Sequence, residues 1–148
     1  MTTTIAVLCP AGPGDALPGW AKDFGGVILP PTDPDSAAPW IAQAALSLHA
    51  AIESLPPARS VTLVAVGTAT TLVPHLGFAA RAARRPISRY VLVDGELPAA
   101  SARSSDWPDA AVVVVCAADS LVAAQAALRG WEVLSGNPAE MVAEVESR

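Results

Sequence analysis

The sequence is poor in positive charge, histidine, cysteine and aromatic residues, and these shortages exclude several classes of function. Its 148 residues include 9 Lys and Arg against 14 Asp and Glu, a formal net charge of −5. Phosphate contacts need clustered basic side chains. The one local cluster, Arg81, Arg84, Arg85 and Arg89, is better suited to the carboxyl end of a helix. We therefore expect no nucleic-acid partner.

Long apolar runs, targeting signals and metal motifs are also lacking. No apolar run reaches the ~18 residues needed to span a bilayer, and no basic region precedes an apolar one near residue 1. The two cysteines, Cys9 and Cys116, fall inside apolar runs, as reduced and buried thiols do. We expect a cytoplasmic protein with no membrane partner. The segment CPAGPG lacks the spacing of a dinucleotide fingerprint, and no Cys/His pattern suits a metal, so we expect no cofactor and no metal.

Apolar residues make up 52% of the chain, which is enough for one folded domain, residues 1–148, with its own core. Six apolar runs alternate with helix-like segments. Continuous rather than alternating hydrophobicity is typical of parallel strands covered on both faces. The fold class predicted is α/β, a three-layer αβα sandwich with a mostly parallel sheet of about six strands. The predicted strands are Thr3–Cys9, Val27–Leu29, Val61–Val66, Tyr90–Val93, Val112–Cys116 and Glu132–Leu134.

The helix-like segments carry signals for their ends. Ala16–Phe24 predicts a short helix, and Pro74 predicts a bend in the helix that follows Val61–Val66. A proline-rich turn over Pro30–Pro34 precedes a helix that Asp35 or Ser36 could cap. Two further helices and their caps are predicted nearer the end of the sequence: Leu121–Leu128 after Asp119 or Ser120, and Pro138–Glu146 after Asn137.

The stretch Val61–Leu72, VTLVAVGTATTL, organises the rest of the chain. A buried strand ends at Gly67, and small and hydroxylated residues then lead into a helical pattern. This order resembles the nucleophile elbow of the α/β-hydrolases. The segments RYVLVDGELP, WPDAAVVVV, AAQAALRGWEVLSG and PAEMVAEV resemble the later strands and helices of that family in the same order. The chain thus resembles a small, lidless member of the α/β-hydrolase superfamily.

The catalytic triad that the resemblance implies is not carried over. Against the pattern G-x-S-x-G, Gly67 stands where the serine nucleophile belongs. Ser135–Asn137 stands where the family has its histidine, and it contains none. Asp119 could hold the place of the acid, but it would have nothing to orient. The two histidines, His49 and His75, fall on the helices before and after the elbow strand. The resemblance therefore implies a degenerate triad.

Ligands of open parallel sheets bind beyond the carboxyl ends of the strands. Asp94 and Glu96 are the candidate catalytic residues, because a cleft beside the elbow would favour the protonated form of one carboxyl, which could then act as a general acid. The alternatives are that Asp94 caps a turn, that Glu96 is solvated and that the elbow threonines cap a helix. The candidate ligand-binding residues are Cys9, Pro10, Gly12, Gly67, Thr68, Thr71 and Asp119.

Two classes of function remain open. The first is a non-hydrolytic enzyme, a cyclase, lyase or isomerase, that acts on a small molecule such as a natural-product intermediate by acid–base or conformational catalysis. The second is an inactive pseudo-hydrolase that binds a ligand or a protein partner. Absence of a lid leaves apolar surface to cover, so we also expect a homodimer.

Overall fold

The computed structural model describes residues 4–9, 18–23, 26–29, 40–54, 60–98 and 107–148. The helices and strands, in chain order, are β1 (Thr4–Cys9), the 3-10 helix η1 (Gly19–Asp23), β2 (Val27–Ile28), α1 (Trp40–Glu53), β3 (Ser60–Val66), the 3-10 helix η2 (Gly67–Leu72), α2 (Val73–Ala82), β4 (Arg89–Val93), β5 (Ala111–Val115), α3 (Leu121–Leu128), β6 (Glu132–Leu134) and α4 (Pro138–Glu146).

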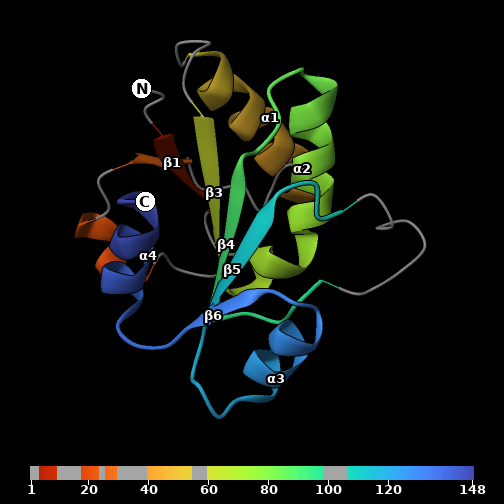
Figure 1. Ribbon diagram of the computed structural model, residues 1–148. Coiled ribbons are helices and arrows are strands. Elements are labelled where there is room, and N and C mark those ends of the chain that lie inside the picture. Colours follow the sequence, from red (N-terminus) through yellow and green to blue (C-terminus); the bar gives the residue numbers. More distant parts are fainter. Residues whose placement is uncertain (1–3, 10–17, 24–25, 30–39, 55–59, 99–106) are drawn as a thin grey trace.

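The strands form one sheet in the order β2-β1-β3-β4-β5-β6, and every neighbouring pair is parallel (Figure 1). β3 lies inside the sheet, where Ala65 is aligned with Cys9 of β1 on one side and with Leu92 of β4 on the other. The predicted α/β sandwich is confirmed, with the elbow strand inside the sheet and β1 beside it.

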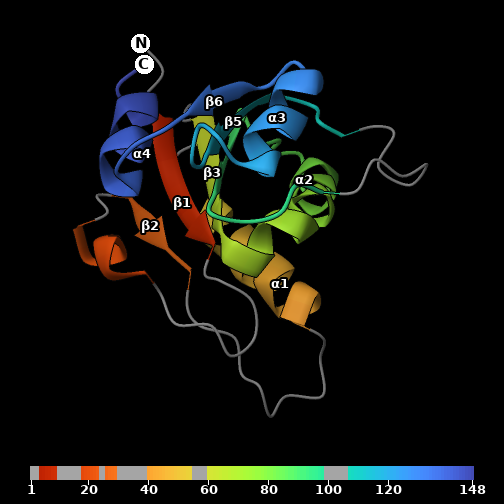
Figure 2. The same cartoon turned by 90° about the horizontal axis from the view of Figure 1, so that it is seen from below.

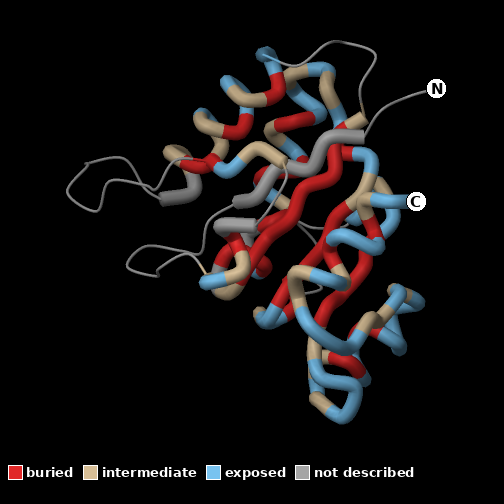
Figure 3. Tube along the Cα trace, turned by 90° about the vertical axis from the view of Figure 1, so that its left-hand side faces the viewer, coloured by how far each residue is buried: buried red, intermediate tan, exposed pale blue. Residues whose placement is uncertain are grey.

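An apolar core covers each face of the sheet. Helices α1, α2 and α3 lie over one face, and α4 with η1 lies over the other (Figures 1 and 2). Alternate residues of β3 enter opposite cores: Leu63 and Ala65 pack under α1 and α2, whereas Val64 and Val66 pack under α4. Figure 3 shows the inner strands β3, β4 and β5 as buried stripes between helices with exposed outer sides. Burial on both faces is why the strands are continuously apolar in sequence.

The predicted ends of the last two helices are found in the structure. The Ser120 hydroxyl accepts a hydrogen bond from the Ala123 N–H at 3.1 Å, so Ser120 rather than Asp119 caps α3. The Asn137 side chain accepts one from the Ala139 N–H at 2.9 Å, and Pro138 is the first residue of α4. Each cap satisfies a main-chain donor that the helix itself leaves without a partner.

Two predicted helices take a different form. Within Ala16–Phe24 the described residues form the 3-10 helix η1, and the glycine and proline at its start disfavour a longer α-helix. The elbow helix also begins as a 3-10 helix, η2, and becomes α-helical only at Val73. Pro74 therefore lies in the first turn of the α-helical part, a position at which proline is tolerated. The predicted turn at Pro30–Pro34 and the caps Asp35 and Ser36 lie outside the described residues.

The connection from β4 to β5 has no helix in its described parts, 94–98 and 107–110. The side chain of Arg129, the residue just after α3, holds the first of these parts, because its Nη1 donates a hydrogen bond to the Pro98 carbonyl at 2.7 Å. No helix in the described ranges is both long and apolar enough to cross a membrane.

Candidate functional site

The turn at the carboxyl end of β3 has the backbone shape expected of an elbow. Gly67 follows the strand directly and has φ +62°, in the left-handed region that glycine adopts without strain. Val66 precedes η2 in an extended conformation, and its apolar side chain makes no capping hydrogen bond to this helix. The main chain therefore reverses sharply at Gly67 and presents main-chain donors at the edge of the sheet.

A threonine hydroxyl ties this turn to the loop that follows β4. Thr70 is fully buried, and its Oγ1 lies 2.6 Å from the Glu96 carbonyl oxygen and 2.9 Å from the Gly67 carbonyl oxygen. One hydroxyl proton is thus shared between two carbonyl acceptors. Because this hydroxyl is buried and bonded to the main chain, it is not open to a ligand.

Glycine at position 95 lets the two segments approach. A Cβ atom built on Gly95 would lie 2.2 Å from the Gly67 carbonyl oxygen and 2.2 Å from Thr70 Oγ1. Real Cβ atoms do not come this close to other heavy atoms, so only glycine fits without a shift of the main chain. The loop after β4 is therefore packed against the elbow through its backbone.

The two candidate carboxylates flank this glycine. Asp94 has φ +50°, which is uncommon for a residue with a side chain, and its N–H donates to the Val115 carbonyl of β5 at 3.1 Å. Asp94 and Glu96 are exposed, whereas the following Leu97 and Pro98 are buried. The loop is therefore anchored on both sides, and its carboxylates face solvent beside the elbow.

The other predicted site residues that the structure describes lie at or after the carboxyl ends of β1, β3 and β5. Cys9 is the last residue of β1 and Thr68 lies in η2, while Pro10 and Gly12 lie outside the described residues. Thr71 is exposed and makes an interaction within the chain. Asp119 is exposed in the turn before α3. Because β4 separates β5 from β3, Asp119 is one strand farther from Gly67 than Asp94 is.

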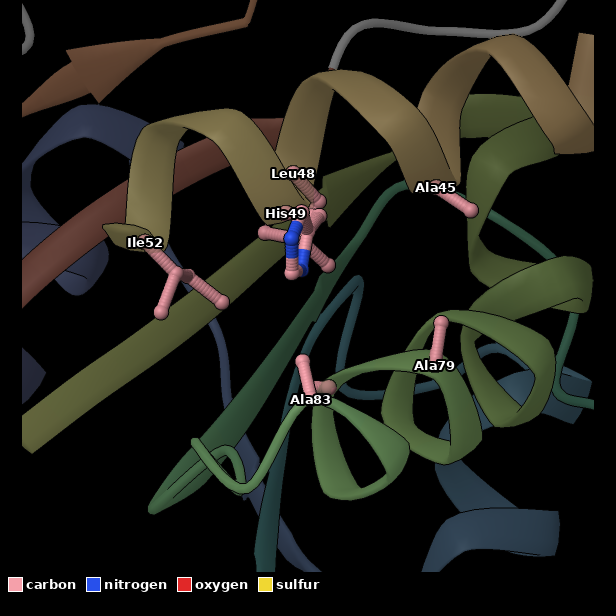
Figure 4. A pocket seen from close by; sticks show the side chains of 7 residues that line it. Ala45, Leu48, His49, Ile52, Ala79 and Ala83 are labelled. Carbon is pink, nitrogen blue, oxygen red and sulfur yellow. The ribbon is translucent and has the colours of Figure 1, made fainter. Parts of the chain in front are cut away.

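The histidines and the described thiol sit on other parts of the fold. His49 Nε2 lies 3.1 Å from Glu53 Oε1, at a cavity of about 10 Å³ between α1 and α2 (Figure 4). The α2 residues of this cavity belong to the half of that helix farther from Gly67. His75 is exposed near the start of α2, and Cys116 is a half-buried free thiol just after β5.

A larger hollow, of about 360 Å³, lies at the opposite edge of the sheet, by the amino ends of β4, β5 and β6. Arg148 closes one side of it and donates two hydrogen bonds to the Glu132 carboxylate, at 2.7 and 2.6 Å. This pairing holds the pKa of Glu132 below its usual value. Among the residues that the structure describes, no group of three or more His, Cys, Asp or Glu side chains could hold a metal ion.

Solved structures with a similar backbone belong to one superfamily. A protein described as a YdeN-like hydrolase from Pectobacterium atrosepticum matches 90% of this chain and 76% of its own, with a TM-score of 0.58 and 14% identity. A protein described as an α/β-superfamily hydrolase from Xanthomonas campestris pv. campestris matches 99% of this chain and 93% of its own, with a TM-score of 0.53 and 15% identity. The chain has the α/β-hydrolase fold.

A third structure with this fold has a named activity. It is a dienelactone hydrolase-like promiscuous phosphotriesterase from metagenomic libraries, which matches 93% of this chain and 70% of its own, with a TM-score of 0.52 and 16% identity. No family model matches the sequence, and no curated protein matches it. At these identities the likeness to known α/β-hydrolases is one of fold.

Within the α/β-hydrolase fold, the contact that sequence reasoning missed is the one between the elbow and the Asp94–Pro98 loop. A glycine within or close to a strand can mark a close approach of two backbones, and Gly95 lies two residues after the end of β4. The sequence therefore held a hint of the contact, although it could not show that Gly67 and Thr70 were the partners.

The Thr70 hydroxyl offers a test of this contact. Thr70→Val keeps the shape of the side chain and removes the hydroxyl, which leaves two carbonyl groups short of a donor, and we expect a loss of about 1–3 kcal/mol in the free energy of unfolding. Urea unfolding measures the change. Thr70→Ser is the matched control, because it keeps the hydroxyl and should retain most of that stability. Equal losses in both variants would contradict a role for the hydrogen bonds.

Proposed function

We propose that this α/β-hydrolase-fold protein is a non-hydrolytic enzyme that acts on a small molecule at the carboxyl ends of β1, β3 and β4. The proposal begins from what the elbow contains. Gly67 has no side chain to attack a substrate, and no histidine follows β6 in Ser135–Asn137. Triad hydrolysis needs both a nucleophile and a base that activates it. The chemistry proposed is therefore proton transfer.

The observation that carries the proposal is the held position of the Asp94–Glu96 loop. The left-handed Asp94, the close approach of Gly95 and the buried Thr70 hydroxyl together fix two carboxylates beside Gly67. Backbone conformations of this kind persist where the surrounding structure enforces them, and they are frequent at functional sites. A loop that served only to connect β4 to β5 would need none of these features.

In the proposed mechanism, Asp94 or Glu96 takes a proton from the bound molecule or gives one to it. A ligand that lies over the loop removes water from the carboxyl, which favours its protonated form and lets it act as a general acid. The first N–H groups of η2, which the Val66 side chain does not cap, would face a carbonyl or anionic oxygen of the ligand. The reaction classes that fit are cyclisation, elimination and isomerisation, for example on an intermediate of natural-product synthesis.

The test uses 5-nitrobenzisoxazole, whose ring opens when a carboxylate removes one proton. We expect the protein to accelerate this elimination, and Asp94→Asn or Glu96→Gln to lower the accelerated rate about 100-fold, since general acid–base catalysis contributes roughly 10²–10⁴-fold. Glu140→Gln is the matched control, because Glu140 is an exposed carboxylate on α4, on the other face of the sheet. If both loop variants keep the full rate, the proposal is overturned.

A second function is favoured by a different observation. Asp94 and Glu96 are exposed, and large apolar side chains on α3 are also exposed, as in proteins that bind a partner without turnover. A pseudo-hydrolase of this kind would show no acceleration of the elimination in the unmodified protein. Both functions predict that a serine-reactive fluorophosphonate probe does not label the elbow.

A further inference from the structure

Helix α3 carries an apolar outer side that nothing in the described structure covers. Leu121 and Leu128 are 73% and 88% exposed, the highest values among the large apolar residues of the described chain. Ala124 and Gln125 between them are exposed as well. These four residues have the spacing i, i+3, i+4 and i+7, so they form one stripe along the helix.

The composition of α3 is unusual for a helix at a protein surface. The sequence LVAAQAAL contains no charged residue, and Gln125 is its one polar side chain. Ala123 and Ala126 bury the inner side against the sheet. A surface helix normally carries charged residues on its outer side, and a helix that is apolar all round is normally covered all round. The exposed stripe thus indicates a surface that is covered when the protein functions.

We propose that the α3 stripe binds the α3 stripe of a second copy of this chain, with the two helices antiparallel about a twofold axis. In that arrangement a residue of one copy faces the residue of the other copy whose number, added to its own, gives 249. Leu121 then faces Leu128 of the second copy, and Ala124 faces its Gln125. The large residues meet each other at the two ends, and the small alanine lets the helices approach at the centre.

The charges that flank the stripe complement each other in the same arrangement. Asp119 lies just before α3 and Arg129 just after it, and both are exposed. Neither forms an ion pair with another described residue. Arg129 instead donates to the Pro98 carbonyl and lies with its Cζ 5.0 Å from the centre of the Trp131 ring. An antiparallel pair brings the Asp119 end of each helix beside the Arg129 end of the other, whereas a parallel pair would place like charges together.

A segment of the same chain is a poorer occupant for this surface. Arg129 bonds the Pro98 carbonyl, and the chain continues from Pro98 into the segment 99–106. This segment reads AASARSSD and has no apolar residue larger than alanine. An eight-residue helix buries less than the ~800 Å² per partner of a standard interface, so we expect a weak dimer that forms only at high protein concentration.

Sedimentation velocity on the full chain from about 1 to 500 μM tests the proposal. We expect a concentration-dependent change from a 15.0 kDa monomer to a dimer of twice that mass. Leu121→Glu and Leu128→Lys should each weaken the dimer at least about 10-fold, with unchanged circular dichroism because both side chains are exposed in the monomer. The control is Leu46→Glu on α1, a leucine with 70% exposure outside the stripe, which should leave association unchanged.

The double variant Leu121→Glu/Leu128→Lys decides the orientation of the helices. In the antiparallel pair each glutamate meets a lysine of the other copy, so association should recover toward that of the unmodified protein. A protein that stays monomeric at the highest concentration overturns the proposal and leaves the stripe to another partner. It is equally overturned if the double variant does not recover, or if Leu46→Glu abolishes association while Leu128→Lys does not.

Discussion

Replacing Gly95 with alanine is expected to destabilise the protein by about 3 kcal/mol, at the upper end of the usual range for overpacking. The added methyl group would lie 2.2 Å from the Gly67 carbonyl oxygen, which belongs to the main chain and cannot turn aside as a side chain would. It would meet Thr70 Oγ1 at the same distance. Either the Asp94–Pro98 loop moves away from the elbow or β3 and β4 shift. We expect the thermal midpoint to fall by roughly 10 °C.

Gly19→Ala is the matched control for this substitution. Gly19 lies in η1, and a Cβ atom built there has no neighbour within 4 Å. Alanine at that position should change the free energy of unfolding by less than about 0.5 kcal/mol. Calorimetry of both variants measures the difference. If Gly95→Ala were as mild as Gly19→Ala, the loop would not be packed against Gly67 and the site proposed at this edge would lose its support.

A comparison of Gly95→Ala with Asp94→Asn separates stability from function at this edge of the sheet. Gly95→Ala displaces the main chain that carries Asp94 and Glu96, so it should lower both the stability and the elimination rate. Asp94→Asn keeps the size of the side chain and the backbone, so it should lower the rate alone. A loop that positions a carboxylate predicts this pattern, whereas a purely structural loop predicts no loss of rate in Asp94→Asn.

The sheet and its order follow from local pattern, which is why the sequence predicts them well. The valines of Val61–Val66 and Val112–Cys116 are apolar at successive positions, and only a strand buried on both faces needs that. The structure divides them between the two cores as expected. The caps Ser120 and Asn137 are equally local, because each side chain bonds an N–H two or three residues along the chain.

Contacts between distant segments could not be predicted in the same way. Thr70 bonds the Glu96 carbonyl 26 residues away, and Tyr90 bonds Asp109 across the connection from β4 to β5. Such pairs depend on how strands and loops meet in space. The elbow helix shows a related limit, because a helical pattern does not distinguish a 3-10 start from an α-helix when both bury the same residues. The sequence also did not show that Leu121 and Leu128 are exposed, because exposure depends on which segments meet in space.

Tyr90, the only tyrosine of the chain, is expected to stay un-ionised in alkaline solution for as long as the protein is folded. Its side chain is fully buried, and its hydroxyl donates a hydrogen bond to Asp109 Oδ1 at 2.6 Å. Burial is the main cause that raises the pKa of Tyr90 above its usual value, and the hydrogen bond to Asp109 and its negative charge add to it. Arg81 and Trp107 act in the opposite sense but are outweighed.

The sign of the effect on stability follows from this shift. An unfolded tyrosine ionises near pH 10, while the pKa of folded Tyr90 is higher. The stability from the neutral, buried hydroxyl is therefore complete below about pH 10 and decreases as the pH rises above that value, because the unfolded state releases the proton first. The near-ultraviolet absorbance of tyrosinate should appear together with the loss of circular dichroism. Tyrosinate that appears near pH 10 while circular dichroism is unchanged would contradict burial of this side chain.

Tyr90→Phe is the control that separates the hydroxyl from the ring. Phenylalanine keeps the edge-to-face contact with Trp107, whose ring centre lies 5.2 Å away, and removes the proton that ionises. The Asp109 side chain is only 14% exposed and would keep Arg81 Nε at 3.5 Å as its partner. We expect a loss of about 1.5–3 kcal/mol at neutral pH, the contribution of one hydrogen bond to a charged group. The extra loss of stability above pH 10 should become smaller in this variant, because its ring has no proton to release.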